Sequence, residues 1–242
     1  NAYALSALLI GIAILTLAVA GLPLLLRRRR GQAVRSVQPL DAAALRAATA
    51  PHVSPRELTV TVGDASTTFR GGRVTAVVGP NGAGKTTLMR FISGRLRGAQ
   101  TNAERVVMLT QNPGLPPTAT VRQALTMVTK DAQRTEDLLR AAGLQELGHV
   151  SELPGGQAAQ VALLRALAAR PEVLVVDEPF AAMDVASAAR WRHLLRLAAP
   201  ERTTIIVTHS RVDLTALADD IAVMDAGEVV SQGPAERMLS RP

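Results

Sequence analysis

The chain has 242 residues, contains no cysteine and carries a formal net charge of +7 at pH 7. The absence of cysteine excludes disulfides and thiolate metal sites. Most of the basic excess lies in residues 1–50, which hold six arginines and one acidic residue; residues 51–242 hold 21 basic and 19 acidic residues. Because aromatic residues make up only 2% of the chain and its larger part is nearly neutral, we expect no nucleic-acid partner.

The first apolar segment spans residues 2–26 and contains no charged residue. As a helix it would extend about 37 Å, enough to cross the hydrocarbon core of a bilayer. Arg27–Arg30 follow directly, and basic residues favour the cytoplasmic side of a membrane. Residues 1–30 are therefore predicted to be a transmembrane helix with a basic cytoplasmic flank.

Two other interpretations of the apolar segment fit less well. A signal peptide carries its basic residues before the apolar stretch, whereas here they follow it. A helix buried in a soluble domain would not run directly into four arginines. Since the chain begins with Asn1 rather than methionine, we expect it to be the C-terminal part of a longer polypeptide. Residues 31–50 would then form an alanine-rich, partly helical linker, and a second domain would occupy residues 51–242.

A glycine-rich motif follows the apolar stretch 74–78, which is predicted to be a buried strand, and precedes a predicted helix beginning near Thr87. Strand, glycine loop and helix form the context in which backbone N–H groups and a helix N-terminus bind phosphate. The motif matches the pattern G-x-x-x-x-G-K-[S/T] and consists of Gly79, Pro80, Asn81, Gly82, Ala83, Gly84, Lys85 and Thr86.

The lysine of this motif stands out in a chain that otherwise uses arginine. Among its 27 basic residues only Lys85 and Lys130 are lysines. A compact ammonium and a planar guanidinium are not interchangeable at a phosphate. We therefore expect Lys85 to contact the β- and γ-phosphates of a nucleotide, and the Thr86 hydroxyl to contact Mg²⁺.

Polar residues follow three further predicted strands. Residues 173–176 run into Asp177 and Glu178, residues 203–208 end at His209, and residues 105–110 end at Gln111. Because parallel strands present their carboxyl ends at one edge of a sheet, we expect these side chains to meet. Asp177 would then hold Mg²⁺, and the amide of Gln111 would reach Mg²⁺ or the attacking water. Glu178 would polarise that water, and His209 would contact the γ-phosphate.

A second pair of glycines precedes another predicted helix. Gly155 and Gly156 lie in the sequence Leu-Pro-Gly-Gly-Gln of residues 153–157, and the apolar periodicity predicts a helix over residues 158–170. This N-terminus also suits an anion, but it lies too far along the chain to be assumed a second wall of the same loop.

The motifs together resemble the ATP-binding subunits of ABC transporters, over residues 51–242. Residues 79–87 look like Walker A and residues 173–177 like Walker B, with Glu178 as the catalytic glutamate of the family. Gln111 resembles the glutamine of the Q-loop, and His209 resembles the switch histidine.

The remaining motifs resemble the same family. Residues 153–157 are similar to its signature, usually Leu-Ser-Gly-Gly-Gln, and residues 181–184, which end in Asp184, are similar to its D-loop. The resemblance implies an α/β phosphate-loop NTPase fold with a mixed or parallel sheet and a helical subdomain at about residues 112–165, here preceded by one transmembrane helix. It further implies that two such domains, expected to be a homodimer, sandwich two ATP molecules.

The resemblance implies that ATP and Mg²⁺ are the cofactors of that dimer. It also implies that the catalytic residues are Glu178, His209 and Gln111. Mg²⁺ would be held by Thr86, Gln111 and Asp177. The nucleotide of one subunit would meet the signature of the other. The resemblance implies that the nucleotide is contacted by residues 79–87, the last of which is Thr87. It also implies contacts from Asp177, Gly155, Gly156, Gln157 and Asp184.

Three features depart from the family pattern. Pro154 replaces the serine of the signature, which predicts weakened catalysis. No convincing aromatic residue precedes the glycine loop to stack on adenine; Phe69 and His52 are the nearest candidates. Only 23 residues separate Thr87 from Gln111, so the antiparallel subdomain is expected to be shortened.

Residues 208–219 and 225–228 look most like those of molybdate and sulfate importers. This resemblance implies a motor for uptake of molybdate or a related oxyanion at a bacterial inner membrane, with the ATPase in the cytoplasm. A permease, for which fusion in the same polypeptide is one arrangement, and an extracytoplasmic solute-binding protein would be the partners. An exporter half-transporter, a catalytically weak regulatory subunit and a soluble ATPase of DNA repair or translation are the alternatives.

Overall fold

The computed structural model describes residues 39–112 and 114–240, which belong to one compact unit beginning at Pro39. The predicted transmembrane helix and its arginines lie outside these residues. Within the described ranges, no helix is long and apolar enough to cross a membrane. The predicted boundary near residue 51 stays a prediction.

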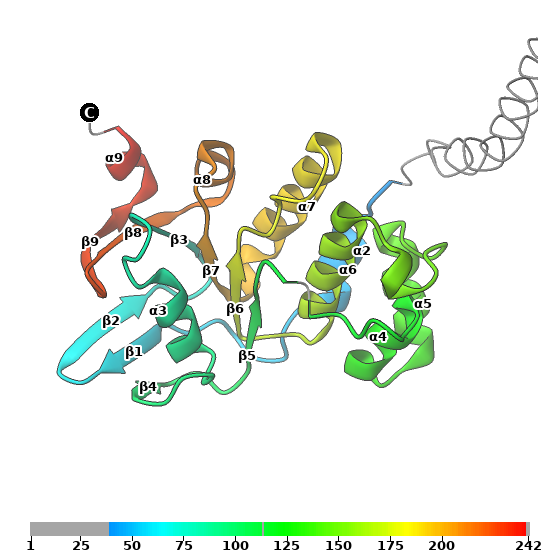
Figure 1. Cartoon of the computed structure of the whole chain (residues 1–242), viewed down its shortest axis with the longest axis horizontal. Helices are drawn as coiled ribbons and strands as arrows, with labels where there is room; N and C mark the ends of the chain where they lie inside the picture. Colours follow the sequence, from blue (N-terminus) through cyan, green and yellow to red (C-terminus); the bar gives the residue numbers. More distant parts are fainter. Residues whose placement is uncertain (1–38, 113, 241–242) are drawn as a thin grey trace, which may run out of the picture. The chain divides into compact units, whose positions relative to one another are not determined.

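A six-stranded sheet forms the centre of the unit (Figure 1). Its strand order is β5-β6-β7-β3-β8-β9; all neighbours are parallel except β9, which runs antiparallel to β8. The strands are β3 (Val74–Val78), β5 (Val106–Leu109), β6 (Val173–Asp177), β7 (Thr203–Val207), β8 (Asp220–Asp225) and β9 (Glu228–Pro234). The four strands predicted from apolar stretches are thus confirmed, with ends that differ by at most one residue.

Both faces of the sheet are covered, which explains why its strands are continuous apolar stretches rather than alternating ones. In β6, Leu174 and Val176 pack into one hydrophobic cluster, whereas Val173 and Val175 pack into another. The first cluster contains the long helices, including α6 (Gly155–Ala168) and α7 (Val185–Ala198). The sheet therefore separates two hydrophobic cores. Because both of its faces are buried, a ligand can reach it only at the loops that follow the strand ends.

The second core lies between the sheet, helix α3 (Lys85–Ile92) and a small antiparallel sheet. That sheet has the order β2-β1-β4, with β1 (Leu58–Val62), β2 (Ala65–Phe69) and β4 (Ala99–Thr101). Strand β4 has three residues, and the expected shortening between the glycine loop and Gln111 stays a prediction.

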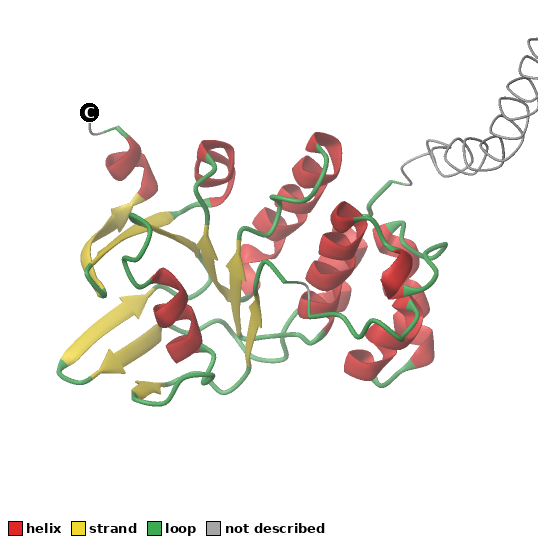
Figure 2. Cartoon of the chain, viewed as in Figure 1, coloured by secondary structure: helices red, strands yellow, loops and turns green. Residues whose placement is uncertain are grey.

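Helices form the part of the unit between β5 and β6 (Figure 2). Helix α4 (Val121–Thr129) begins with a reciprocal capping box in which Thr120 and Gln123 bond each other's backbone N–H. Helix α5 (Ala132–Ala142) begins at an Asp131 cap and ends at Gly143, whose φ of 68° suits glycine. The 3-10 turn η1 (Val150–Glu152) leads to α6.

The remaining helices lie between and after the last strands of the central sheet. The 3-10 turn η2 (Ala199–Glu201) links α7 to β7. Helix α8 (Arg211–Leu217) follows β7 and is capped by Ser210, which accepts the backbone N–H of Asp213. Helix α9 (Ala235–Leu239) follows β9.

Helix α2 (Ala42–Thr49) lies ahead of β1 and packs on α5, α6 and α7. Its residue Leu45 is fully buried, and its last carbonyls accept arginine side chains from elsewhere in the fold. Arg134 of α5 and Arg170 after α6 donate to the carbonyl of Ala48, at 3.3 and 3.2 Å. Arg202, before β7, donates to the carbonyl of Thr49 at 2.8 Å. We call these carbonyls and the three arginines the α2 junction.

Candidate functional site

The glycine loop between β3 and α3 has a conformation that other residues would not adopt. Gly79 has φ of 154°, and a Cβ there would lie 2.2 Å from the carbonyl oxygen of Met224. Gly84 has φ of 95°, caps the N-terminus of α3 and lies close to Gly227 of the β8–β9 turn. The N–H of Gly227 donates to the carbonyl of Ala83 at 3.0 Å. The loop is thus packed against the neighbouring hairpin.

Lys85 is the first residue of α3, so α3 begins two residues before the predicted Thr87. Its side chain is 9% exposed, and its Nζ donates to the carbonyls of Gly79 and Pro80 at 2.8 and 2.9 Å. The ammonium therefore lies over the loop's own backbone, at the N-terminal end of a helix. A positive charge held beside several N–H groups suits a polyphosphate.

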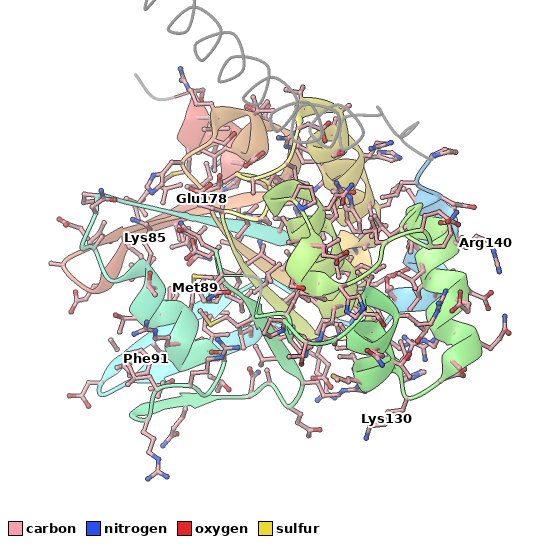
Figure 3. The ribbon with its side chains drawn as sticks, turned by 45° about the vertical axis from the view of Figure 1, so that its right-hand side comes forward. Lys85, Met89, Phe91, Lys130, Arg140 and Glu178 are labelled. Atoms are coloured by element: carbon pink, nitrogen blue, oxygen red, sulfur yellow. The ribbon has the colours of Figure 1, made fainter. Side chains whose placement is uncertain are left out.

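The four strand ends meet in one cavity of about 500 Å³, which we call the strand-end cavity. Figure 3 labels Lys85 and Glu178, two of the residues that line it. The prediction that the glycine loop, Gln111, Asp177, Glu178 and His209 lie together is confirmed geometrically. The residues that line the cavity are Asn81, Gly82, Gly84, Lys85, Thr86, Thr87, Gln111, Asp177, Glu178, Val207 and His209.

Asp177 ends β6 opposite Val207 and is only partly exposed. Burial raises the pKa of its carboxyl group, and the adjacent negative charge of Glu178 raises it further. Lys85 and His209 act in the opposite direction and lower the pKa. A partly desolvated carboxylate next to a second carboxylate gains from an opposite charge, so Asp177 is suited to face a bound cation.

Glu178 follows with φ of 46°, a left-handed conformation that is uncommon for glutamate. Its N–H donates to the carbonyl of Val207 at 2.9 Å, so the chain leaves the sheet edge in a fixed direction. Its Oε1 accepts the backbone N–H of His209 at 2.7 Å. Glu178 is therefore tied to the strand end that carries His209.

Three oxygen donors in the strand-end cavity suit a hard divalent cation. Thr86 offers a hydroxyl, Gln111 an amide oxygen and Asp177 a carboxylate, and all three line the cavity. Mg²⁺ prefers such ligands and usually keeps several waters and substrate phosphates. Among residues 39–112 and 114–240, no group of three or more His, Cys, Asp and Glu side chains could hold a metal.

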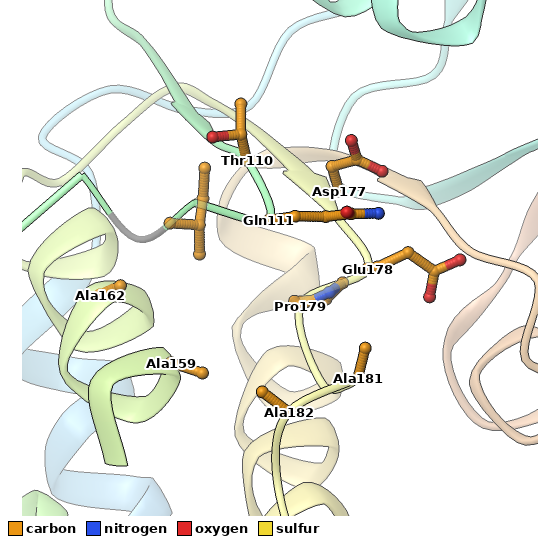
Figure 4. A pocket seen from close by; sticks show the side chains of 10 residues that line it. Thr110, Gln111, Ala159, Ala162, Asp177, Glu178, Pro179, Ala181 and Ala182 are labelled. Atoms are coloured by element: carbon orange, nitrogen blue, oxygen red, sulfur yellow. The ribbon is translucent and has the colours of Figure 1, made fainter. Parts of the chain in front are cut away.

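A smaller cavity of about 320 Å³ adjoins the strand-end cavity (Figure 4). Gln111 lines both, and its side chain extends toward Asp177 and Glu178. The other wall is formed by alanines of α6 and of the loop after Pro179, including Ala159 and Ala182. Gln111 thus lies between the sheet edge and the helical part of the unit.

The residues of the predicted signature and D-loop do not line the strand-end cavity. Helix α6 begins at Gly155, three residues before the predicted Ala158, because Pro154 provides its N-cap and accepts the N–H of Gln157. A Cβ at Gly156 would lie 2.8 Å from the carbonyl of Ala182, so the two segments are packed together. Asp184 caps α7 by accepting the N–H of Ser187, whose hydrogen bonds lower the pKa of Asp184.

The candidates for base stacking are unsuitable. Phe69 is 0% exposed in the second core, and the ring of His52 contacts Arg170 at 2.8 Å. A third cavity of about 630 Å³ shares Gly82, Gly84 and Thr87 with the strand-end cavity and is otherwise lined mainly by β1, β2, α3 and the β8–β9 turn. The support that Gly227 gives the loop was not predicted; the one signal for it in the sequence is a glycine next to Ala226 at a strand end.

Comparison with known proteins agrees with this geometry. Residues 62–181 match the family model described as ABC transporter. This chain is 34% identical to the molybdenum import ATP-binding protein ModC of Mycobacterium tuberculosis, over 71% of this chain and 56% of that protein. It is 34% identical to the sulfate/thiosulfate import ATP-binding protein CysA of Synechocystis, with the same coverage. It is 36% identical to the Fe(3+) ions import ATP-binding protein FbpC 1 of Rhodococcus jostii, over 71% of this chain and 57% of that protein.

The chain thus spans a little over half the length of these relatives. A solved structure described as an inward-facing conformation of a metal-chelate type ABC transporter has the same fold, with a TM-score of 0.65 at 21% identity. That match covers 76% of this chain and 86% of the other. The described residues therefore form an α/β ABC transporter ATP-binding domain that resembles the ATP-binding proteins of importers.

Proposed function

We propose that the chain binds and hydrolyses Mg²⁺–ATP and is the motor of an importer for a small solute. The observation that carries this proposal is the strand-end cavity, because it combines a phosphate-binding loop with a carboxylate, an amide and a histidine from three other strand ends. Phosphoryl transfer requires such positioning and charge stabilisation more than covalent chemistry by the protein.

Each cavity residue has a role that its position supports. Lys85 and the loop N–H groups would bind the β- and γ-phosphates. Thr87, which lines both the strand-end cavity and the third cavity, would also contact the nucleotide. Thr86, Gln111 and Asp177 would hold Mg²⁺, which neutralises phosphate charge when it is bound. Glu178 would polarise the attacking water, and His209 would contact the γ-phosphate.

A second copy of this chain would complete the site. Gly155, Gly156, Gln157 and Asp184 lie outside the strand-end cavity, so their proposed contacts with the nucleotide require a partner domain. Pro154 has no hydroxyl and no N–H, which leaves the neighbouring glycine N–H groups as the donors of the signature. We propose a head-to-tail homodimer that closes on ATP and reopens after hydrolysis.

For the solute we propose molybdate or a related oxyanion, taken up at the bacterial inner membrane. The relatives named for molybdenum, sulfate and Fe(3+) import support an inorganic ion in general. A permease, an extracytoplasmic solute-binding protein and the membrane itself would be the partners. Residues 2–26 would be the last membrane helix of that permease, and residues 39–240 would lie in the cytoplasm. Loss of molybdate uptake, with sulfate uptake intact, in cells lacking the chain would support the choice of solute.

Pro154 also favours a second function, a catalytically weak regulatory subunit that binds ATP. Glu178 and His209, both retained, argue against it. Steady-state hydrolysis by the full chain distinguishes the two, with Glu178→Gln as the test variant and Glu152→Gln, an exposed glutamate of η1, as the control. Turnover that is lost only in Glu178→Gln supports the motor; ATP binding without turnover in all three proteins supports the regulatory subunit.

A further inference from the structure

The carboxylate of Glu178 is held by two consecutive residues at the end of β7. Besides the N–H of His209 on Oε1, its Oε2 lies 3.3 Å from the hydroxyl oxygen of Thr208. Thr208 follows β7 directly and is 1% exposed. Both oxygens of the carboxylate therefore face donors from the same strand end.

The Thr208 hydroxyl itself is fixed by two further contacts. It accepts the backbone N–H of Ser210 at 3.1 Å, and it lies 3.0 Å from Oδ2 of Asp213. A hydroxyl has one proton, so Thr208 can donate to only one of the two carboxylates at a time. Asp213 offers the shorter contact and, at 3% exposure, is the more deeply buried of the two.

A cation anchors Asp213 from its other side. Arg192 of α7 donates from Nε to Oδ1 of Asp213 at 2.5 Å. The guanidinium carbon of Arg192 lies 5.1 Å from the ring centre of Phe180, which is 4% exposed. Phe180 is two residues after Glu178. The contacts that run from Glu178 through Thr208, Asp213 and Arg192 therefore end in the same chain segment in which they begin.

We call this closed set of contacts the Glu178 ring; its members are Glu178, Thr208, Asp213, Arg192 and Phe180. Four of its side chains are less than one-fifth exposed, so their hydrogen bonds form in a desolvated environment where misplacement is costly. None of these four lines the strand-end cavity. These four residues are therefore suited to orient Glu178 without lining the cavity in which a nucleotide would bind.

We propose that Thr208 is a positioning residue for Glu178, and that the buried pair Asp213–Arg192 holds Thr208 in place. This inference rests on the proposed role of Glu178 toward the attacking water. When the Thr208 proton is on the Glu178 side, the hydroxyl and the N–H of His209 together hold both oxygens of the carboxylate, so that it is directed before the nucleotide arrives. Preorganisation of this kind affects turnover much more than substrate affinity.

The test compares Thr208→Val and Thr208→Ser in the full chain. Valine keeps the shape and removes the hydroxyl, whereas serine keeps the hydroxyl. For Thr208→Val we expect kcat to fall about 10-fold or more, with KM and ATP affinity within about 2-fold of the wild type. Thr208→Ser is expected to restore most of kcat. Thr215→Val is the matched control, because Thr215 is exposed on α8 and bonds only the carbonyl of Arg211.

A second readout does not depend on hydrolysis. The N–H of His209 donates to Glu178, so its hydrogen exchange reports whether the carboxylate stays in place. We expect faster exchange at His209 in Thr208→Val, and wild-type exchange in Thr208→Ser and Thr215→Val. Unchanged exchange and unchanged kcat in Thr208→Val would overturn the proposal, as would equal losses in the valine and serine variants. A wild type that binds ATP without hydrolysing it would contradict the proposed function, and exchange at His209 would still decide the role of Thr208.

Discussion

The strand-end cavity and the α2 junction both gather positive charge beside backbone polar groups, but they use it in opposite ways. In the cavity, Lys85 lies over its loop beside open space that a ligand can enter. At the junction, the guanidinium groups of Arg134, Arg170 and Arg202 donate to the last carbonyls of α2. The first arrangement is available for binding, whereas in the second the guanidinium groups bond carbonyls of the fold itself.

The electrostatics of the junction support this distinction. Burial lowers the pKa of Arg202 to about 10, and burial together with the nearby charge of Arg170 lowers the pKa of Arg134. Arg134 and Arg170 repel each other, whereas the negative charge of Glu201 favours charged Arg202; the negative end of the α2 dipole offsets part of the remaining cost. The junction joins α5, α6 and the strand β7 through one short helix, so we expect it to govern stability.

The largest expected effect is on stability and concerns α2. Leu45→Ala removes a fully buried side chain and is expected to lower the free energy of unfolding by about 2–5 kcal/mol. ATP affinity of the molecules that remain folded should be unchanged. Urea unfolding beside equilibrium ATP binding measures both, with Leu239→Ala, 40% exposed, as the control. A large loss of affinity in folded Leu45→Ala would mean that the two regions are coupled.

The next effect is on affinity and leaves stability nearly unaltered. Lys85→Ala removes the ammonium of the loop and is expected to weaken ATP binding about 100-fold, because a charged hydrogen-bond donor to phosphate is lost. The control is Lys130→Asn, which removes the chain's other lysine at a position with φ of 54° that asparagine tolerates. Normal ATP affinity in Lys85→Ala would contradict the assignment of the loop.

A smaller effect is expected at the signature. Pro154→Ser supplies a hydroxyl at the N-cap of α6 and should raise turnover by up to about 10-fold if that donor limits catalysis. Pro154→Ala removes the proline ring without adding a hydroxyl. It therefore separates the effect of the new hydroxyl from the effect of losing the proline. Equal turnover in all three proteins would mean that the N–H groups of the glycines suffice.

The smallest effect is a pH-dependent change in stability at Asp177. Because burial raises its pKa in the folded protein, ionisation of Asp177 opposes folding, and stability falls as the pH rises from the ordinary value toward the raised one. Asp177→Asn should therefore stabilise the nucleotide-free protein at pH 7. The gain should shrink toward about pH 4, where the carboxyl group takes up a proton in both states. Urea unfolding at the two pH values tests the sign; a gain that grows toward low pH would contradict it.

The same two regions explain how much of the structure could be predicted. The strand ends were found because predicted strands of four to six residues with apolar centres end next to Gln111, Asp177 and His209, and parallel strands bring such ends to one edge. The left-handed conformation of Glu178 and its ties to residues 207–209 carry no local sequence signal. They depend on how β6 and β7 pair.

The α2 junction could not be predicted for a related reason. Residues 42–49 are rich in alanine, and eight residues are too few for a helix that is stable alone. Its stability comes from Leu45 and from arginines that lie 86 to 153 residues away in the chain. A sequence pattern within one segment does not report contacts of that range.

The most direct test of the central claim is a structure of the full chain carrying Glu178→Gln, determined with Mg²⁺ and ATP. We predict that the triphosphate occupies the strand-end cavity, with Lys85 at the β- and γ-phosphates and the metal beside Thr86 and Asp177. A triphosphate bound elsewhere, or bound without contact to Lys85, would contradict the account.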